Sequence, residues 1–322
     1  NILVTGGAGF IGSHLIDRLL ADGQQVICLD NLNDYYDPQI KILNQSSHLD
    51  YLNYEFIKGD IRDAETVNSI FDDYEIDIVV HLAAMAGVRL SIENPKLYTD
   101  VNINGTQILL EAMMGSFVKK FIFASSSSVY GNNKKTPFSE DDNVDFQISQ
   151  YGATKKMGEV MCYTYHHLSG IPISCMRFFT VYGPRQRPEM AIHKFTRMLK
   201  KGEAIPFFGD GSTSRDYTYI DDIIDGIMGA LFSEDQFAIY NLGNSKPVKL
   251  DELVHIIGKR LSIEPKLDHQ KLPTGDVQET FADVSRAKSR LDYMPKISIE
   301  GGIYRFVNWY ETVMESNGEL FS

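Results

Sequence analysis

A glycine-rich turn directly follows the first apolar segment of the chain and constrains its fold more than any other feature. Residues 5–14 read Thr-Gly-Gly-Ala-Gly-Phe-Ile-Gly-Ser-His and come after a β-branched run at residues 2–5. The glycines fit the spacing GxGxxG from Gly7 or GxxGxxG from Gly6. Both spacings let a pyrophosphate approach backbone N–H groups at the N-terminus of a helix. The candidate pyrophosphate contacts are Gly6, Gly9, Phe10, Ile11 and Gly12.

Short strand-like runs alternate with stretches of helical periodicity through the first half of the chain. Such alternation predicts right-handed strand–helix–strand crossovers and a parallel sheet with helices on both faces. The predicted strands are residues 2–5, 25–30, 54–58, 78–81, 121–124 and 171–177. The predicted helices are residues 11–21, 64–71, 103–114, 151–168 and 192–200.

An acidic residue ends the second predicted strand. Asp30 lies eighteen residues beyond Gly12, where a carboxylate can accept hydrogen bonds from the hydroxyls of an adenosine ribose. Asn31 and Leu32 offer no cation for a 2′-phosphate, so the sequence predicts NAD rather than NADP. A glycine turn or a strand-end aspartate alone is often only a tight turn or a helix cap, but their order here favours the cofactor. Further candidate cofactor contacts are Asn31, Asp60, Ile61, Leu82, Ala83, Ala84 and Phe178.

Beyond Phe178 the pattern becomes less regular, yet no linker rich in serine or glycine interrupts it. We therefore expect an α/β protein with a doubly wound parallel-sheet Rossmann domain and a smaller C-terminal α/β lobe that binds the substrate. The NAD-binding domain is expected to span residues 1–178 plus about 215–242. The smaller lobe is expected to span about 179–214 and 243–322.

Tyr151 and Lys155 lie four residues apart at the start of a predicted helix, so their side chains rise from one helix face. A phenol with an ordinary pKa of about 10 acts as a base at neutral pH only if nearby positive charge lowers that pKa. Lys155 and an oxidised nicotinamide ring would supply two such charges. The same spacing is common on solvated helices and indicates catalysis only beside the nucleotide motif. Four serines at 125–128 follow the fifth predicted strand and either hold a sugar oxygen or merely cap the loop.

The composition narrows the class of partner. Thirty-one Lys and Arg against 43 Asp and Glu give a net charge of −12, which argues against a nucleic-acid or membrane-surface binder. Cys28, Cys162 and Cys175 are far apart among apolar neighbours, as expected of buried thiols in a reducing compartment. No apolar run reaches membrane-spanning length and no targeting peptide is visible, so we expect a cytoplasmic chain. The eight histidines lack the spacing of metal ligands, and no metal site is predicted.

Together these residues resemble the extended short-chain dehydrogenase/reductases, in particular the sugar-nucleotide epimerases and dehydratases. The resemblance rests on the glycine turn, Asp30, Asp60-Ile61, the run 81–84, Ser-Ser-Ser-Val-Tyr-Gly at 126–131, Tyr151 with Lys155, and Arg-Asp-Tyr at 215–217. It implies NAD as the cofactor, a nucleotide-sugar substrate, and Ser126 as the catalytic hydroxyl beside Tyr151 and Lys155. It also implies a homodimer, in which the helices at 103–114 and 151–168 would pack against a second copy.

The resemblance implies an opening step in which Tyr151 takes a proton from a sugar hydroxyl while hydride leaves the same carbon for NAD, which gives a 4-keto sugar. Related dehydratases and uronate decarboxylases place an acidic residue directly after the catalytic hydroxyl. Here Ser127 and Ser128 follow Ser126. The sequence therefore favours return of hydride to the opposite face, which is epimerisation at C4.

Residues 177–191 are similar to the corresponding segment of UDP-glucuronate 4-epimerases, in which the run Arg-Pro-Asp/Glu-Met-Ala is distinguishing. Neutral-hexose 4-epimerases carry Asn where Thr180 stands. A uronate brings a carboxylate, for which Arg187 offers a cation with a fork of donors. Our hypothesis is that Ser127, Ser128, Thr180 and Arg187 hold this carboxylate so that the β-keto acid intermediate keeps its CO2.

The resemblance also implies contacts for the UDP moiety. Arg215 is expected to bind the diphosphate, Asp276 the uridine ribose, and Phe208 to stack on the base, although paired aromatic residues on a strand more often belong to a core. Backbone near Ala191 and Ile192 completes the predicted UDP site. Arg89 is typical of uronate epimerases and is expected to touch the diphosphate or the sugar.

Two alternatives stay open at this point. The nearest is a 4-epimerase of UDP-glucose or of a UDP-N-acetylhexosamine, against which Thr180 and Arg187 argue. The other is a non-enzymatic NAD-sensing or RNA-binding protein of the same fold, against which the Tyr151 and Lys155 pair and the acidic net charge argue.

Overall fold

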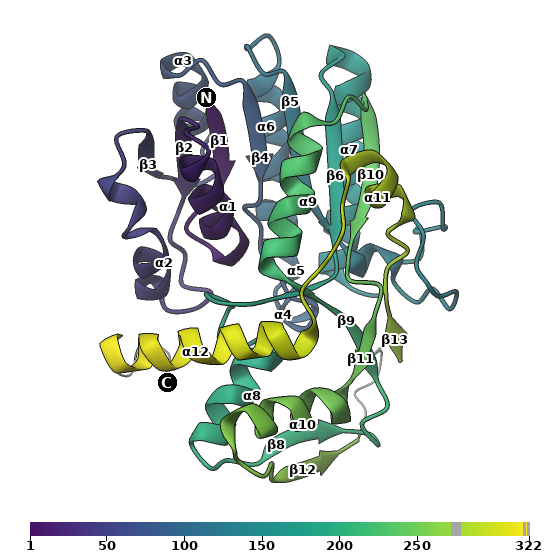
Figure 1. Ribbon diagram of the computed structural model, residues 1–322. Coiled ribbons are helices and arrows are strands. Elements are labelled where there is room, and N and C mark those ends of the chain that lie inside the picture. Colours follow the sequence, from purple (N-terminus) through teal and green to yellow (C-terminus); the bar gives the residue numbers. More distant parts are fainter. Residues whose placement is uncertain (272–277, 318–319, 321–322) are drawn as a thin grey trace.

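Seven parallel strands form the large sheet of the computed structural model, which describes residues 1–271, 278–317 and 320 (Figure 1). The strand order is β10-β6-β5-β4-β1-β2-β3, so the direction in which strands are added changes between β1 and β4. This confirms the predicted doubly wound parallel sheet. The strands are β1 Ile2–Thr5, β2 Val26–Asp30, β3 Tyr54–Lys58, β4 Ile78–His81, β5 Lys120–Ser126, β6 Ile173–Phe178 and β10 Phe237–Leu242.

Helices cover both faces of this sheet because alternate strand residues point to opposite sides. Val4 packs in one hydrophobic core with Leu15 of α1 and Ile223 of α9. Its neighbour Leu3 packs in the other core with Leu109 of α6, and α3 and α7 lie on the same side. The helices of the large domain are α1 Phe10–Ala21, α2 Pro38–Gln45, α3 Ala64–Asp73, α4 Val88–Glu93, α5 Pro95–Thr99, α6 Thr106–Met113, α7 Gln150–Ser169 and α9 Ile220–Phe232. Short helical segments are η1 His48–Asp50, η2 Asp100–Gly105 and η3 Ser127–Tyr130.

Local sequence signals fix both ends of α7, the longest of these helices. Ser149 caps its N-terminus, where the side-chain oxygen accepts a hydrogen bond from the backbone N–H of Gly152 at 3.1 Å. Gly170 ends it in the left-handed conformation with φ 73°, which glycine adopts without a steric penalty. These caps place Tyr151 in the first turn of the helix, at the carboxyl edge of the large sheet.

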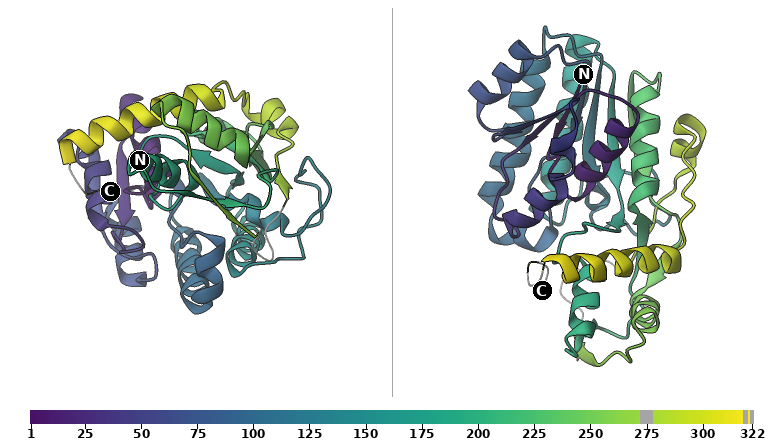
Figure 2. Two further views of the ribbon diagram at one scale, coloured as in Figure 1. Left: turned by 90° about the horizontal axis from the view of Figure 1, so that it is seen from below. Right: turned by 60° about the vertical axis from the view of Figure 1, so that its left-hand side comes forward.

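The C-terminal part of the chain forms a smaller lobe below that edge. Strands β11, β9 and β13 pair in that order, β7 pairs with β9, and β8 pairs with β12. In Figure 1 and in the right-hand view of Figure 2, α12 lies across the junction of the two lobes. The elements are β7 Thr180–Tyr182, α8 Ala191–Lys200, β8 Ile205–Phe208, β9 Ser214–Tyr219, β11 Pro247–Lys249, α10 Leu250–Leu261, β12 Leu267–Gln270, β13 Glu279–Thr280, α11 Ser285–Leu291 and α12 Ile299–Asn317.

Strand β9 lies in the smaller sheet, whereas the sequence prediction grouped residues from about 215 with the large domain. The reason is the buried carboxylate of Asp216, which accepts backbone N–H groups from Asn244, Ser245 and Ala282 at 2.7–3.0 Å. These bonds tie β9 to the segments that flank the smaller sheet. The chain returns to the large sheet with α9 and β10.

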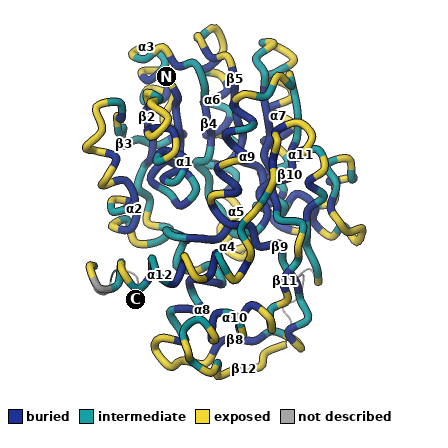
Figure 3. The backbone as a smooth tube through the Cα atoms, in the orientation of Figure 1, coloured by how far each residue is buried: buried dark blue, intermediate teal, exposed yellow. Residues whose placement is uncertain are grey.

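Strands β1, β2, β5 and β6 of the large sheet are buried along their whole length, and Figure 3 shows this buried centre of the large domain. Cys28, Cys162 and Cys175 are buried and unpaired thiols. Within the described residues, no helix combines the length and the apolar character needed to cross a membrane.

Candidate active site

A cavity of about 380 Å³ opens at the carboxyl edge of the large sheet. Its walls come from the turn between β1 and α1, from the ends of β2 to β6, from the start of α7 and from the loop after β7. It brings together most of the residues predicted from the sequence: Gly6, Gly9, Phe10, Ile11, Gly12, Asp30, Asn31, Asp60, Ile61, Leu82, Ala83, Ala84, Ser126, Ser127, Ser128, Tyr151, Lys155, Phe178, Thr180 and Arg187.

The glycine turn leaves no room for side chains where it faces the cavity. A Cβ on Gly12 would lie 2.3 Å from the carbonyl oxygen of Gly6, and Gly6 itself has φ +72°. Helix α1 starts after Gly9 without a side-chain cap, so its first backbone N–H groups remain available to an anion. The geometry fits the predicted role of the turn in binding a pyrophosphate.

The side chain of Asp30, at the end of β2, is hydrogen-bonded to this turn. Its Oδ2 accepts the backbone N–H of Ala8 at 3.1 Å, and its Oδ1 accepts that of Leu32 at 2.9 Å. Burial raises the pKa of the carboxyl group, and these two N–H groups and the charge of Lys41 oppose the rise. Each carboxylate oxygen keeps acceptor capacity beyond one N–H, so the group can still receive two ribose hydroxyls.

Lys41 is a cation in the cavity wall that the sequence prediction missed. Its Nζ donates to the backbone oxygen and to Oδ1 of Asn33, both at 2.8 Å. Burial lowers its pKa, and the charge of Asp30 opposes this shift. The prediction of NAD considered only Asn31 and Leu32, next to Asp30 in sequence, because α2 carried no recognised pattern. Other lining residues that it missed include Asn33, Tyr35, Tyr36, Met85, Ala86, Gly87, Phe179 and Met190.

Tyr151 and Lys155 reach the cavity from one face of α7, but they are held separately. The Nζ of Lys155 donates to the backbone oxygen of Ala124 at 2.7 Å, and burial lowers its pKa to about 8. Burial raises the pKa of Tyr151, whereas a hydrogen bond from Ser126 and the charge of Arg187 lower it. Arg187 is therefore a further cation that counteracts the effect of burial on the phenol, beside Lys155 and the nicotinamide ring that the sequence predicts for this role.

Arg187 extends into the cavity from the loop between β7 and α8. Its Nε lies 3.1 Å from Oε1 of Glu189, and its guanidinium lies over the ring of Tyr35 at 5.4 Å. The same loop is anchored to α1 by an ion pair between Arg185 and Asp17, 2.7 Å apart. The Nη2 of Arg187 donates to Sδ of Met190 at 3.5 Å, so Glu189, Tyr35 and Met190 together hold this side chain in the cavity wall.

Hydroxyl groups line the wall near Tyr151. Ser126 ends β5 and its Oγ accepts the backbone N–H of Ser128 at 3.1 Å, which shapes the short helix η3. Thr180 adds a further hydroxyl from β7. Among the described residues that line this cavity, the carboxylates are Asp30 and Asp60, and both belong to the nucleotide end.

The residues predicted for the UDP moiety lie outside this cavity lining and remain predictions. They are Arg89, Ala191, Ile192, Phe208 and Arg215, while Asp276 lies outside the described residues. The guanidinium of Arg89 lies over the ring of Phe208 at 5.6 Å, so two of them meet across the junction of the lobes. Arg215 donates to the backbone oxygen of Ser214, and the side chain of Ile192 is buried in the core.

Comparison with known proteins agrees with this geometry. The family model described as GDP-mannose 4,6 dehydratase matches residues 3–306. The chain belongs to this family. The predicted resemblance to the extended short-chain dehydrogenase/reductases is confirmed.

Relatives and solved structures within the family carry epimerase names. The chain is 44% identical over 314 residues to a UDP-glucuronate 4-epimerase from Thermodesulfobacterium geofontis, and the match covers 97% of each chain. The crystal structure of UDP-glucuronic acid 4-epimerase from Bacillus cereus with UDP-glucuronic acid and NAD has a TM-score of 0.91 at 36% identity, covering 97% of this chain and 99% of that one. A UDP-glucose 4-epimerase from Thermotoga maritima has a TM-score of 0.90 at 33% identity, covering 98% and 99%. Similarity of the backbone therefore does not distinguish epimerases of acidic sugars from epimerases of neutral sugars.

The pKa of Lys155 predicts a pH dependence of stability. The folded value is about 8, against about 10.4 in an unfolded chain. Between these values the unfolded chain binds more protons, so the free energy of unfolding rises with pH. Between these two pH values, we expect the free energy of unfolding of the wild type to rise by roughly 3 kcal/mol more than that of Lys155→Met. Urea unfolding at several pH values measures the difference, and a difference that stays flat with pH would contradict the prediction.

Proposed function

We propose that this protein is an NAD-dependent 4-epimerase that interconverts UDP-glucuronate and UDP-galacturonate through a transient 4-keto sugar, without decarboxylation. One observation carries the proposal: Arg187 lies in the same cavity as Tyr151 and the hydroxyls of η3, while the lining carboxylates lie at the other end. A guanidinium among hydroxyls suits an acidic sugar. The names of the relatives support the same reaction.

The residues at the nucleotide end fit NAD. The crowded glycine turn and the free N-terminus of α1 suit a pyrophosphate, and Asp30 suits a ribose diol. Lys41 does not remove this preference, because its ammonium is already bonded to both oxygens of Asn33. Bound NAD supplies a reversible acceptor for the hydride at C4 of the sugar.

Tyr151 is the proposed acid and base at the sugar 4-hydroxyl, and Ser126 holds the same oxygen. The hydrogen bond from Ser126 and the charge of Arg187 favour the phenolate form that takes the proton, against the effect of burial. Lys155 keeps a positive charge close to the site while its Nζ is fixed on Ala124. The same phenol returns the proton when the 4-keto sugar is reduced on its other face.

The carboxylate must be held while the sugar carries a ketone at C4, because a β-keto acid loses CO2 when the breaking bond aligns with the ketone. Ser127, Ser128, Thr180 and Arg187 are the proposed contacts. Glu189 engages the Nε of Arg187, and Nη2 donates only to the weak acceptor Sδ of Met190 at 3.5 Å, so the terminal nitrogens are the proposed contacts of the substrate carboxylate. Such a clamp lets the ring turn over while the carboxylate stays in place.

The proposed UDP site lies toward the smaller lobe. Arg89 from α4 and Phe208 from β8 already meet there, so one can contact the diphosphate or sugar while the other stacks on the base. Arg215, Asp276 and the backbone at Ala191 and Ile192 complete this proposal. A substrate in this position would bridge the two lobes with its sugar at Tyr151.

The alternative substrates are UDP-glucose and a UDP-N-acetylhexosamine, since a neutral-sugar epimerase has nearly the same backbone. These sugars offer no carboxylate to Arg187. A neutral hexose would place no anion beside the charged guanidinium in the wall near Tyr151, so it suits this site less well than a uronate.

We also propose a homodimer formed through α7. Its outer face exposes Met157, Val160, Tyr163 and Leu168, a larger apolar strip than a solvated helix normally carries. In sedimentation velocity we expect wild type to be a dimer and Met157→Glu with Val160→Glu to be a monomer. Phe232→Glu, on the exposed end of α9, is the control and should stay dimeric. A monomeric wild type would contradict the proposal.

Substitution of Arg187 tests the substrate. We expect Arg187→Ala to lower kcat/KM for UDP-glucuronate by about 10–100-fold, as loss of a charged hydrogen-bonded pair should, and to release some UDP-pentose. Turnover of UDP-glucose should fall less, because a neutral sugar loses only the effect of the Arg187 charge on the pKa of Tyr151. Liquid chromatography with mass detection separates the epimer, the pentose and any dehydrated sugar.

Arg185→Ala is the matched control, because it loosens the same loop by removing the ion pair to Asp17. It should affect acidic and neutral sugars alike. An Arg187→Ala enzyme with unchanged uronate affinity and unchanged epimerisation would overturn the clamp.

A further inference from the structure

A buried ion pair lies behind the candidate active site. Glu159 of α7 and Arg177 of β6 have side chains that are each 1% exposed, and they form a two-pronged contact. Nε of Arg177 donates to Oε1 at 2.8 Å and Nη2 donates to Oε2 at 2.9 Å. Buried pairs of this kind often add little stability compared with apolar residues of similar volume. Their fixed geometry points to a different use.

Glu159 lies on the same helix face as Tyr151 and Lys155, because the three residues are spaced by four. The three last residues of β5 hold this face. Ser126 lies near enough to Tyr151 to lower the pKa of its phenol, the backbone oxygen of Ala124 accepts Lys155 Nζ at 2.7 Å, and Ser125 Oγ donates to Glu159 Oε1 at 2.6 Å. Glu159 is therefore the third attachment of α7 to β5, one turn behind Lys155.

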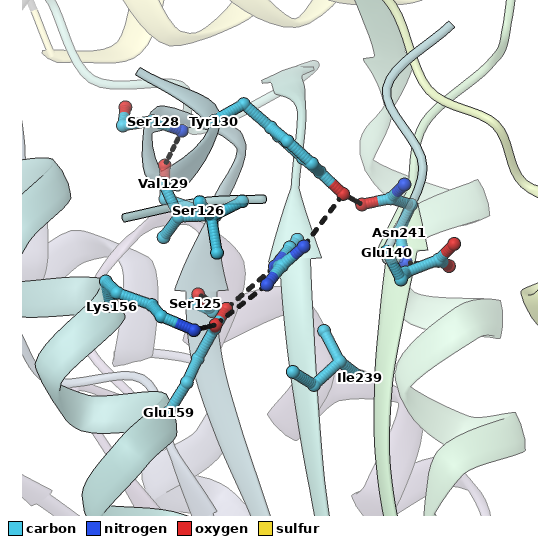
Figure 4. A network of polar contacts seen from close by, with 12 residues as sticks. Ser125, Ser126, Ser128, Val129, Tyr130, Glu140, Lys156, Glu159, Ile239 and Asn241 are labelled. Carbon is cyan, nitrogen blue, oxygen red and sulfur yellow. Dashed lines mark hydrogen bonds and ion pairs between the residues drawn. The ribbon is translucent and has the colours of Figure 1, made fainter. Parts of the chain in front are cut away.

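A row of residues across three strands holds Glu159 in turn. Ser125 of β5 pairs in register with Arg177 of β6, which pairs with Asn241 of β10. Figure 4 shows this network, with Ser125 and Glu159 at one end and Tyr130 and Asn241 at the other. A shift of α7 along β5 would break contacts to two strands at once.

The other end of the network reaches the serine loop. The Nη1 of Arg177 donates to Tyr130 Oη at 3.0 Å, and Tyr130 donates to Asn241 Oδ1 at 2.7 Å. Tyr130 is the last residue of η3, the segment that carries Ser127 and Ser128. One ion pair thus joins the helix of the proposed base to the loop of the proposed carboxylate contacts.

We infer that Glu159, through Arg177 and Ser125, is a positioning residue that fixes Tyr151 and Lys155 relative to Ser126 and the serine loop. The inference rests on the proposed function, which assigns the chemistry to these groups. Small displacements of reacting groups cost up to about a hundredfold in rate. Loss of the network should therefore lower kcat by more than it raises KM, because Arg187 and the proposed UDP contacts lie outside the network and only Ser127 and Ser128 are held by it.

The experiment removes both charges together, because a single substitution would leave a buried charge without its partner. Glu159→Leu with Arg177→Met replaces the pair by apolar side chains. We expect a folded protein with wild-type NAD content, a kcat per bound NAD that falls by about 10–100-fold, and a KM for UDP-glucuronate that changes much less than kcat. Ser125→Ala, which removes only one hydroxyl, should give a smaller fall in kcat at unchanged KM.

Lys120→Met is the matched control at the opposite end of β5. There Lys120 is buried and donates to the backbone oxygens of Ser233 and Asp235 at 2.9 and 3.3 Å. Its loss disturbs the same strand away from the cavity, so kcat per bound NAD should stay at the wild-type level.

The inference is overturned if the charge-free variant is folded and keeps kcat within about twofold of wild type. If that variant does not fold, Ser125→Ala decides, and full activity of this variant overturns the inference. A wild type that is inactive on UDP-glucuronate refutes the proposed substrate instead. The same variants are then compared on whichever of UDP-glucose and UDP-N-acetylglucosamine the wild type epimerises, and a wild type inert toward all three ends both proposals.

Discussion

The carboxyl ends of seven parallel strands all open on one edge of the large sheet, and every candidate functional group depends on that constraint. The glycine turn, Asp30, the serines after β5 and the start of α7 are far apart in sequence, yet they share one cavity. Helix α7 brings Tyr151 and Lys155 to this edge. The last three residues of β5 interact with the helix face that carries them. The smaller lobe closes the edge from below and adds Thr180 and Arg187.

Arg187 connects substrate recognition with proton transfer. Its charge lowers the pKa of Tyr151, and the same guanidinium is the proposed partner of the uronate carboxylate. The carboxylate of a bound substrate would then pair with the same guanidinium that favours the phenolate of Tyr151. The position of this carboxylate would therefore affect both substrate binding and proton transfer. A neutral-sugar epimerase has almost the same backbone, so our proposal assigns the choice of substrate to the side chains around this arginine.

Sequence patterns predicted those parts of the fold and site whose signals are local. The glycine turn, Asp30 and the pair Tyr151 and Lys155 each stand in a short motif, and the structure brings them into one cavity. Lys41 was missed because it lies on a short helix with no recognised pattern and bonds to Asn33 in the cavity wall. Strand β9 was misplaced because distant backbone groups bind Asp216. The Glu159 and Arg177 pair could not be predicted either, since only the packing of α7 against β5 and β6 brings them together.

The central claim is that hydride leaves C4 of an acidic sugar and returns to the same carbon while the carboxylate stays in place. UDP-glucuronate with deuterium at C4 tests this claim most directly, with mass detection and NMR of the separated products. The account predicts UDP-galacturonate that keeps the deuterium at C4, with no UDP-pentose formed. Loss of the label to water, or release of a UDP-pentose by the wild-type protein, would contradict it.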